Sequence, residues 1–469
     1  MPTWPQRLRS PLTPLIAASA VLTIAVGALS GAKPQLGILT AVGVVFVALV
    51  LTNLQAGFAV MVMFAYLEVL SVLGGVSLAK VAGALIVVAW LATVSTGGRE
   101  QQRNLFTEHP TFTYIILAFV GWSAISVSWS ENSPTAVTSV MRYALDALLL
   151  PIAFTAIRNR RDAIRILAAI VVGAGIAAVS AIVAPPPPES AISGRAAGTV
   201  GDPNELAAAL LVGLAIATAF LVNRHIRSPL RALSGIAAVL CLAGILISLS
   251  RGGLIGTACA LLIAIVVGGR WRGRVLALCG TLAVLAVGYF ALLASLPAKE
   301  RVLDVSAGGG TGRLDLWTVA LRMIEAHPLN GIGSGQFPIS SVHYLLRPGL
   351  IQNGAFILST PKVAHNTYLN VLAELGVLGG SLFIAMIVFS VGCAVVAIRR
   401  LTRAKDELME ILARGFVVGL GGYLATLLFL SESTEKLFWI LIAIGPALLA
   451  VANAVERDAR DSAPAQAPP

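Results

Sequence analysis

The sequence predicts an all-α polytopic integral membrane protein with about 12–14 transmembrane helices and one large extracytoplasmic loop. Of the 469 residues, 57% are hydrophobic and only 12% are charged, whereas about a quarter of the residues of a soluble domain carry charge. Apolar runs of about 20 residues, the length that crosses a bilayer as a helix, recur from Leu12 to Val455. The composition therefore excludes a soluble enzyme.

Fourteen segments are long and apolar enough to be spans, and 12 would remain if two pairs of short neighbours merged. They are roughly 12–31, 36–53, 56–75, 77–96, 111–129, 134–156, 163–183, 204–223, 229–249, 253–269, 275–295, 367–397, 411–431 and 437–455. The first segment follows two arginines, as the apolar part of a signal peptide does. However, it is not followed by a clear small-residue cleavage site and a polar start of a mature chain. We expect a retained helix.

The basic residues indicate how the spans are oriented. Clusters such as Arg158/Arg160/Arg161 and Arg270/Arg272/Arg274 lie in alternate connections, and the short connections between them carry few basic residues. Cytoplasmic loops are enriched in Lys and Arg. We therefore expect a multi-pass protein of the cytoplasmic (inner) membrane with both termini cytoplasmic and the loop 296–366 extracytoplasmic.

Other classes of protein fit less well. The net charge is +11, but the basic residues are not interleaved with aromatic ones as in a nucleic-acid groove, so we expect no nucleic-acid partner. The four cysteines all fall in apolar spans, without a CxxC motif or a histidine at metal-ligand spacing. We expect no disulfide, no metal and no cofactor.

Three segments on the expected outer side carry candidate functional residues. The first is the turn SLSRGGLIG (Ser248 to Gly256). Arg251 can simply snorkel to the lipid headgroups. Alternatively, Gly252 and Gly253 let the backbone approach an anion while the guanidinium forks onto a phosphate. The turn alone does not decide between these interpretations.

The second segment lies in the long loop, from Gly308 to Phe337. Helical spacing from Leu314 to Ile324 places Leu316, Ala320 and Met323 on one face, and His327-Pro328 ends this helix. The following GIGSGQF lacks the Lys-Ser/Thr of a phosphate-binding loop. We expect it to be a turn that lets the chain pack at the membrane surface, with one or two short helices of the loop lying over an outward cleft.

The third segment, AHNTYLNVLAELGVLGG (Ala364 to Gly380), re-enters the membrane. His365 and Asn366 are expected at the outer boundary, where a histidine is often only a cap or a surface residue. Glu374 lies nine residues deeper, and an ionisable residue at that depth marks a site or a buried partner. Further intramembrane charges are Glu68, Lys80, Arg142 and Asp146. Arg142 and Asp146, four residues apart, can pair on one helix face.

These segments, in this order, resemble the O-antigen ligase and O-antigen polymerase superfamily. The matching pieces are SRGG at Arg251, Arg313 with Trp317 four residues later, HPLNGIGSGQF, and HNTYLNVLAELGVLGG, together with GDPNELAAAL at 201–210. The resemblance covers about 200–440, and the first 190 residues match only as a run of helices. We therefore divide the chain into N-terminal transmembrane helices (1–190), an O-antigen ligase-like domain with its extracytoplasmic loop (191–455), and a disordered cytoplasmic tail (456–469).

The resemblance implies a metal-independent glycosyltransferase that acts outside the cytoplasmic membrane. Its donor would be a glycan on a polyprenyl, typically undecaprenyl, diphosphate, and its acceptor a glycan, lipid or protein hydroxyl. Arg251 and Arg313 match the arginines that bind the diphosphate, and His365 matches the histidine proposed to activate the acceptor. Possible supporting residues are Glu374, which could orient His365, and Asn366, Trp317, Arg142 and Asp146.

Two alternatives stay open. A polymerase would use the same donor chemistry and add the glycan to another lipid-linked repeat unit. A transporter would place its ionisable residues along a central path, for instance through Glu68, Lys80, Arg142 and Asp146. The sequence shows no internal repeat of the kind that carriers usually have, and Arg251, Arg313 and His365 are all expected on the outer side of the membrane. Both observations favour a transferase over a transporter.

Overall fold

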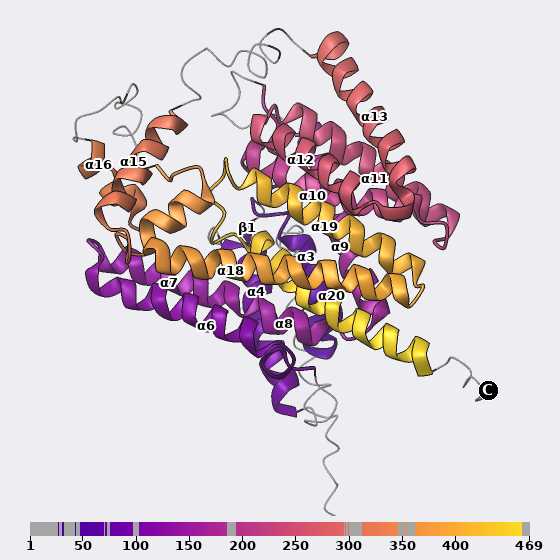
Figure 1. Cartoon of the computed structure of the whole chain (residues 1–469), viewed down its shortest axis with the longest axis horizontal. Helices are drawn as coiled ribbons and strands as arrows, with labels where there is room; N and C mark the ends of the chain where they lie inside the picture. The colour runs from indigo at the N-terminus through magenta and orange to yellow at the C-terminus, as the bar shows by residue number, and fades with distance from the viewer. Residues whose placement is uncertain are drawn as a thin grey trace, which may run out of the picture.

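The structure is a computed structural model that describes residues 47–69, 71–72, 76–96, 103–184, 194–294, 312–345 and 362–461, together with isolated residues at 27, 31, 43, 296, 299 and 351. Within these residues it is a bundle of helices (Figure 1). Ten helices are long and apolar enough to cross a membrane, and two shorter apolar helices, α3 (Leu54–Phe64) and α12 (Arg251–Val267), accompany them. The predicted class, an all-α multi-pass membrane protein, is confirmed.

The N-terminal part contains several helices and one antiparallel hairpin whose strands have two residues each. The hairpin pairs β1 (Ser71–Val72) with β2 (Val76–Ser77). The remaining helices are α4 (Leu78–Thr96), α5 (Leu105–Glu108), α6 (Pro110–Ile125), the short η2 (Ser126–Trp129), α7 (Ser133–Ala147), α8 (Leu149–Ala156) and α9 (Arg160–Val183). Of the first predicted span, 12–31, only residues 27 and 31 are described, and of the second, 36–53, only residues 43 and 47–53.

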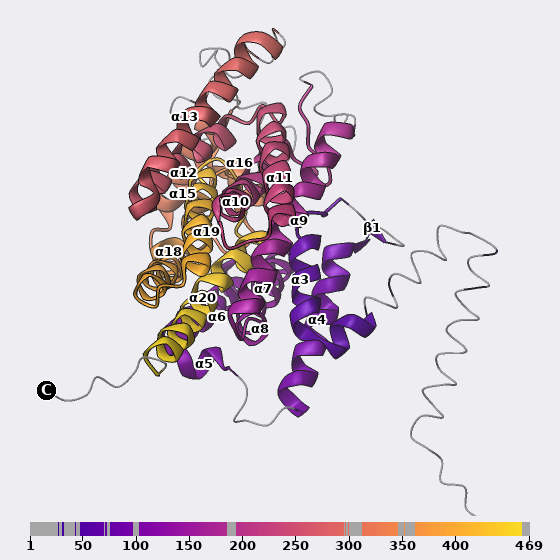
Figure 2. The ribbon, with the colours of Figure 1, turned by 90° about the vertical axis from the view of Figure 1, so that its right-hand side faces the viewer.

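The C-terminal part contains the longer helices. They are α10 (Pro203–Val222), α11 (Ser228–Ile247), α12, η4 (Gly269–Trp271), α13 (Arg272–Gly288) with η5 (Tyr289–Leu293), α15 (Arg313–Ala326), α16 (Phe337–Leu345), α18 (Thr367–Arg403), α19 (Glu407–Thr426) and α20 (Lys436–Asp461). Helix α10 packs against α9, α11, α12 and α19, and α20 packs against α8 and α18 (Figure 2). These two helices form the centre of the bundle, whereas α13 lies at its edge, with no fully buried residue in its apolar stretch.

Polar caps in the sequence set where many helices begin. Asp202 accepts hydrogen bonds from the amides of Asn204 and Glu205 at the start of α10, where Pro203 occupies the first turn. Asn366 does the same at the start of α18 for Tyr368 and Leu369. Such side chains satisfy amides that have no partner inside the helix. These caps therefore fix the residues at which α10 and α18 begin.

The C-terminal helix is longer than expected. The sequence predicts that the last span ends at 455 and that 456–469 form a disordered tail, but α20 continues to Asp461. Glu456 is buried and pairs with Arg400 at 3.3 Å and with Arg460 at 2.9 Å. The pair with Arg400 joins the last turns of α20 to α18, and the pair with Arg460 lies within α20. Residues 462–469 lie outside the described part of the chain.

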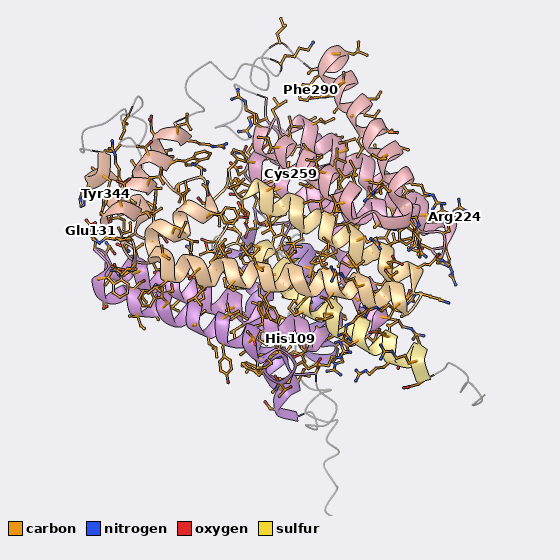
Figure 3. All side chains as sticks on the ribbon, in the orientation of Figure 1. His109, Glu131, Arg224, Cys259, Phe290 and Tyr344 are labelled. Carbon is orange, nitrogen blue, oxygen red and sulfur yellow. The ribbon has the colours of Figure 1, made fainter. Side chains whose placement is uncertain are left out.

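The candidate residues lie at one of the two ends of the bundle. Glu131 and Tyr344 lie at one end, near α15 and α16, and Arg224 lies at the opposite end (Figure 3). Helix α12 begins at Arg251 and helix α15 at Arg313, and His365 directly precedes the cap of α18. These three helix starts lie at the end of the bundle near α15. The three candidate residues are thus on the same side of the bundle, as the alternation of basic clusters predicted.

Candidate functional site

The loop that joins α19 to α20, residues 427–435, is the point at which the candidate segments meet; we call it the α19–α20 loop. The amide of Thr367 donates to the carbonyl of Leu427 at 2.9 Å, and the Thr367 hydroxyl donates to that of Leu430 at 2.7 Å. The ring of Phe429 lies 6.2 Å from that of Trp317. A Cβ atom on Gly252 would come within 3.0 Å of the Phe429 side chain. The starts of α12, α15 and α18 therefore all reach this loop.

Arg251 begins α12 in a turn that a network of polar side chains holds in place. The hydroxyl of Ser250 accepts from the amide of Gly253 at 3.1 Å and donates to the Asn204 amide oxygen at 2.9 Å. The guanidinium of Arg195 donates to the same oxygen at 2.7 Å and to the carbonyl of Ser248 at 3.0 Å. Since Arg195 is buried, this network fixes the backbone from which Arg251 projects.

The two glycines after Arg251 have packing roles. Gly252 faces Phe429, and a Cβ atom on Gly253 would collide with the side chain of Ala207 on α10. The sequence offered the interpretation that these glycines bring the backbone close to an anion. In the structure, helix packing accounts for both glycines.

Arg313 is the first residue of α15. Gly312, in the left-handed region with φ of 75°, precedes it, and His327 caps the other end of the helix. Leu316, Ala320 and Met323 are completely buried. The helix predicted from Leu314 to Ile324, with these three residues on its inner face, is therefore confirmed, and it extends by one residue before and two after the predicted range.

His365 lies immediately before α18 with a positive φ of 48°, which is uncommon for a residue other than glycine. Burial and, after it, the nearby guanidinium of Arg313 lower the pKa of His365, and the carboxylate of Asp202 opposes the shift. This electrostatic coupling indicates that Arg313 and the cap of α10 are neighbours of the imidazole. The environment favours a neutral imidazole, which can accept a proton.

Glu374 does not serve His365. It is 3% exposed, and its carboxylate accepts the amides of Gly335 at 2.8 Å and Phe337 at 3.2 Å. The structure does not bear out a direct contact by which Glu374 would orient His365, because the described hydrogen bonds of the carboxylate go to the amides of Gly335 and Phe337. Glu374 instead binds the loop that follows α15.

The GIGSGQF segment wraps around a break in α18. Gly376 has a non-helical conformation inside that helix, and the amide of Val377 donates to the carbonyl of Pro328 at 2.9 Å. Ser334 reaches the other side, where its amide donates to the Ser126 hydroxyl at 3.0 Å. The segment is a packing turn, as predicted, but it packs inside the protein, between α18 and the η2 region.

A cavity lined by several carboxylates lies beside the α19–α20 loop. Its lining includes Glu68, Glu205, Glu432 and Glu435, and Glu68 pairs with Lys436 at 3.0 Å. Burial, and then the neighbouring carboxylates, raise the pKa of Glu432 and of Glu435. These acids are therefore protonated at a pH at which an exposed glutamate is ionised.

The remaining intramembrane charges differ in burial. Lys80 and Arg142 are exposed, and Asp146 is buried with one carboxylate oxygen without a hydrogen bond. The possible pair of Arg142 with Asp146 is not among the ion pairs of the described residues, although Arg142 and Glu68 both act electrostatically on Asp146. Of these four charges, only Glu68 takes part in an ion pair in the described part of the chain, with Lys436.

Sequence reasoning missed several residues around Arg251, namely Arg195, Asn204 and Ser250, and also the three further glutamates of the cavity. The GDPNELAAAL element at 201–210 contains Asn204 and Glu205 and was the signal that could have found them. In the described part of the chain, no group of three or more His, Cys, Asp or Glu side chains is placed to hold a metal ion.

Comparison with known families gives one result. Residues 236–384 match the family model described as O-antigen ligase. This segment contains Arg251, Arg313, Trp317, His365 and Glu374. A search of curated proteins finds no match to the chain.

Proposed function

Since residues 236–384 match the O-antigen ligase family model, we propose that this membrane protein is a glycosyltransferase. It transfers a glycan from a polyprenyl (undecaprenyl) diphosphate carrier to an acceptor hydroxyl, without a metal ion. The observation that carries the proposal is the meeting of the starts of α12, α15 and α18 at the α19–α20 loop. This arrangement gathers two arginines and a neutral histidine at one end of a lipid-facing bundle.

Arg251 and Arg313 bind the diphosphate of the donor. When the bond between the sugar C1 and the diphosphate oxygen breaks, the electron pair stays on the diphosphate and its negative charge grows. Guanidinium groups offer forked hydrogen bonds to phosphate oxygens, and fixed positive charges in a poorly solvated site stabilise a charge that develops in the transition state. The leaving group is thereby stabilised without proton transfer.

His365 accepts the proton of the acceptor hydroxyl as the acceptor oxygen bonds to C1. A neutral imidazole is required for this step, and burial together with Arg313 lowers the pKa of His365. The same proximity means that a proton gained by His365 meets the positive charge of Arg313, so it is readily passed on after transfer. Asn366 supports the step by capping α18 directly after the histidine.

The acceptor defines the subclass of the enzyme. We propose a ligase, which passes the glycan to a separate glycan, lipid or protein acceptor, and the alternative within the same family is a polymerase that extends another lipid-linked repeat unit. Both reactions use the donor chemistry described above. We place the site on the extracytoplasmic side of the cytoplasmic membrane, with both termini cytoplasmic, because the basic clusters gather at the other end of the bundle.

The test is a transfer assay on purified variants. Arg251→Ala, Arg313→Ala and His365→Ala should each abolish transfer from a polyprenyl-diphosphate oligosaccharide while the protein still accumulates in the membrane. The matched control is Arg399→Ala, which removes an exposed arginine from the opposite end of α18 and should transfer at the normal rate. If the three variants retain normal rates, the residues have been assigned wrongly.

A further inference from the structure

An open, apolar cleft lies between α10, α12, α13 and α19, away from the candidate site. The empty space within it and in front of its open side is about 910 Å³. Small side chains line its floor, among them Ala215 and Ala219 on α10 and Ala260 and Ala264 on α12. Because α13 stands at the edge of the bundle (Figure 1), this helix forms an outer wall of the cleft. We call it the α12–α13 cleft.

The length of the cleft corresponds to one leaflet of a bilayer. Along α12 its lining runs from Thr257 to Gly268, which is about 16 Å at the rise of an α-helix. The hydrocarbon core of a bilayer is about 30 Å thick, so the cleft extends from one membrane surface to about the midplane. Arg251 lies at the other end of the same helix, beyond Thr257.

The end of the cleft at the membrane surface is strongly basic. Arg274 and Arg414 belong to its lining, together with Trp271. The guanidinium of Arg270 lies 4.2 Å from the centre of the Trp271 ring, and that of Arg414 lies 5.5 Å from it. An indole between guanidinium groups at a helix end is typical of a membrane interface.

The acids nearby neutralise only part of this charge. Glu410 pairs with Arg414 at 2.7 Å and with Arg270 at 3.1 Å, and Glu407 pairs with Arg270 at 3.1 Å. Among the described ion pairs, none includes Arg272 or Arg274, and both are exposed. Arg272 donates its Nε–H to the carbonyl of Ile265 at 3.0 Å, which leaves its Nη groups, and Arg274 lines the cleft itself. These two arginines can therefore offer N–H groups to an anion at the mouth of the apolar cleft.

We propose that the α12–α13 cleft binds an anionic phospholipid of the leaflet at the basic end of the bundle. The acyl chains lie against the alanines of α10 and α12, and the phosphate lies between Arg274 and Trp271. An apolar cleft with a cationic mouth fits a ligand that is apolar along its length and anionic at one end, and such basic pockets between transmembrane helices bind acidic headgroups.

The polyprenyl tail of the donor fits this cleft less well. Its diphosphate would be bound by Arg251 at the opposite membrane surface, and a tail that reached the cleft would bring only hydrocarbon to Arg274. The charge at the mouth would then remain without a partner. A phospholipid uses both the apolar wall and the arginines.

The test is native mass spectrometry of the purified full-length chain in detergent, titrated with dioleoyl-phosphatidylglycerol or dioleoyl-phosphatidylcholine. We expect preferential binding of phosphatidylglycerol. Arg272→Ala and Arg274→Ala should each weaken it about fivefold, since an arginine near an anionic membrane surface contributes about 1 kcal/mol. Both residues are exposed, so these variants should fold. The matched control Arg161→Ala removes another exposed arginine at that end and should change nothing.

A second pair of variants tests the cleft itself. Ala264→Phe fills it and should abolish the preference for phosphatidylglycerol, whereas Leu262→Phe places the same ring on the exposed face of α12 and should not. Equal binding of the two lipids, or unchanged binding in the arginine variants, would overturn the proposal. Undecaprenyl phosphate that competes with phosphatidylglycerol would also overturn the proposal if the competition is lost in Ala264→Phe but kept in Arg274→Ala. In that case the polyprenyl tail of the donor would be the occupant of the cleft.

Discussion

Replacing Glu374 tests whether this buried acid holds the loop after α15 in place. Glu374→Ala removes the acceptor for two amides, those of Gly335 and Phe337. A buried donor left without a partner costs about 1–3 kcal/mol, so the variant should lose about 2–6 kcal/mol of unfolding free energy. Glu374→Gln keeps one acceptor oxygen and should lose about half as much.

The assay is denaturant unfolding in detergent, followed by tryptophan fluorescence. Trp122 is a suitable reporter, because its indole N–H donates to the carbonyl of Leu375 at 2.9 Å. Glu325→Ala, which removes an exposed acid from α15, is the matched control and should stay within about 0.5 kcal/mol of the parent. If Glu374→Ala unfolds like that control, the carboxylate does not anchor the loop and the reasoning is refuted.

Three further predictions concern the site and its surroundings. Arg251→Lys and Arg313→Lys should each lower kcat/KM at least about tenfold, since an ammonium cannot fork onto a diphosphate; full activity in either would show that charge alone suffices. The pH profile of kcat/KM should fall on the acid side with a midpoint below about 6.5, because protonation of His365, whose pKa is lowered, removes the base; a midpoint above that value would argue against this role. Gly333→Ala, at φ of 107° and against Ser130, should cost about 1–3 kcal/mol in the unfolding assay, and an unchanged stability would show that the turn can relax.

Local patterns predicted much of the fold. The spacing of Leu316, Ala320 and Met323 predicted α15, because one face of a helix recurs every three or four residues. The alternation of basic clusters predicted that Arg251, Arg313 and His365 share one end of the bundle. The first signal depends only on residues close together in the chain, and the second depends on the orientation of the chain in the bilayer. Both can therefore be read from a single sequence.

Contacts between distant segments could not be predicted in this way. Glu374 was considered as a residue that could orient His365, but it binds Gly335, a residue 39 positions away, since the break at Gly376 opens α18 to that loop. Arg142 and Asp146 have the spacing of an ion pair, yet packing buries one and exposes the other. Tertiary packing decided these cases, and spacing along one helix does not report it.

The carboxylates of the cavity illustrate the same limit. Glu68, Glu205, Glu432 and Glu435 come from three distant segments, and in the sequence only Glu68 was singled out, as an intramembrane charge. Only the fold brings them together beside the α19–α20 loop, where Thr367 also binds. Their proximity to the starts of α10 and α18 places proton-binding groups next to the proposed site.

The most direct test of the central claim is transfer by the purified protein in EDTA, with a polyprenyl-diphosphate oligosaccharide as donor, first alone and then with an envelope fraction. The account predicts glycan transfer, without metal, to one acceptor of that fraction, and loss of transfer in Arg251→Ala. A ladder of longer lipid-linked chains from the donor alone would instead identify a polymerase. No transfer under either condition, or transfer that Arg251→Ala leaves intact, would contradict the claim that the arginines bind a lipid diphosphate for glycan transfer.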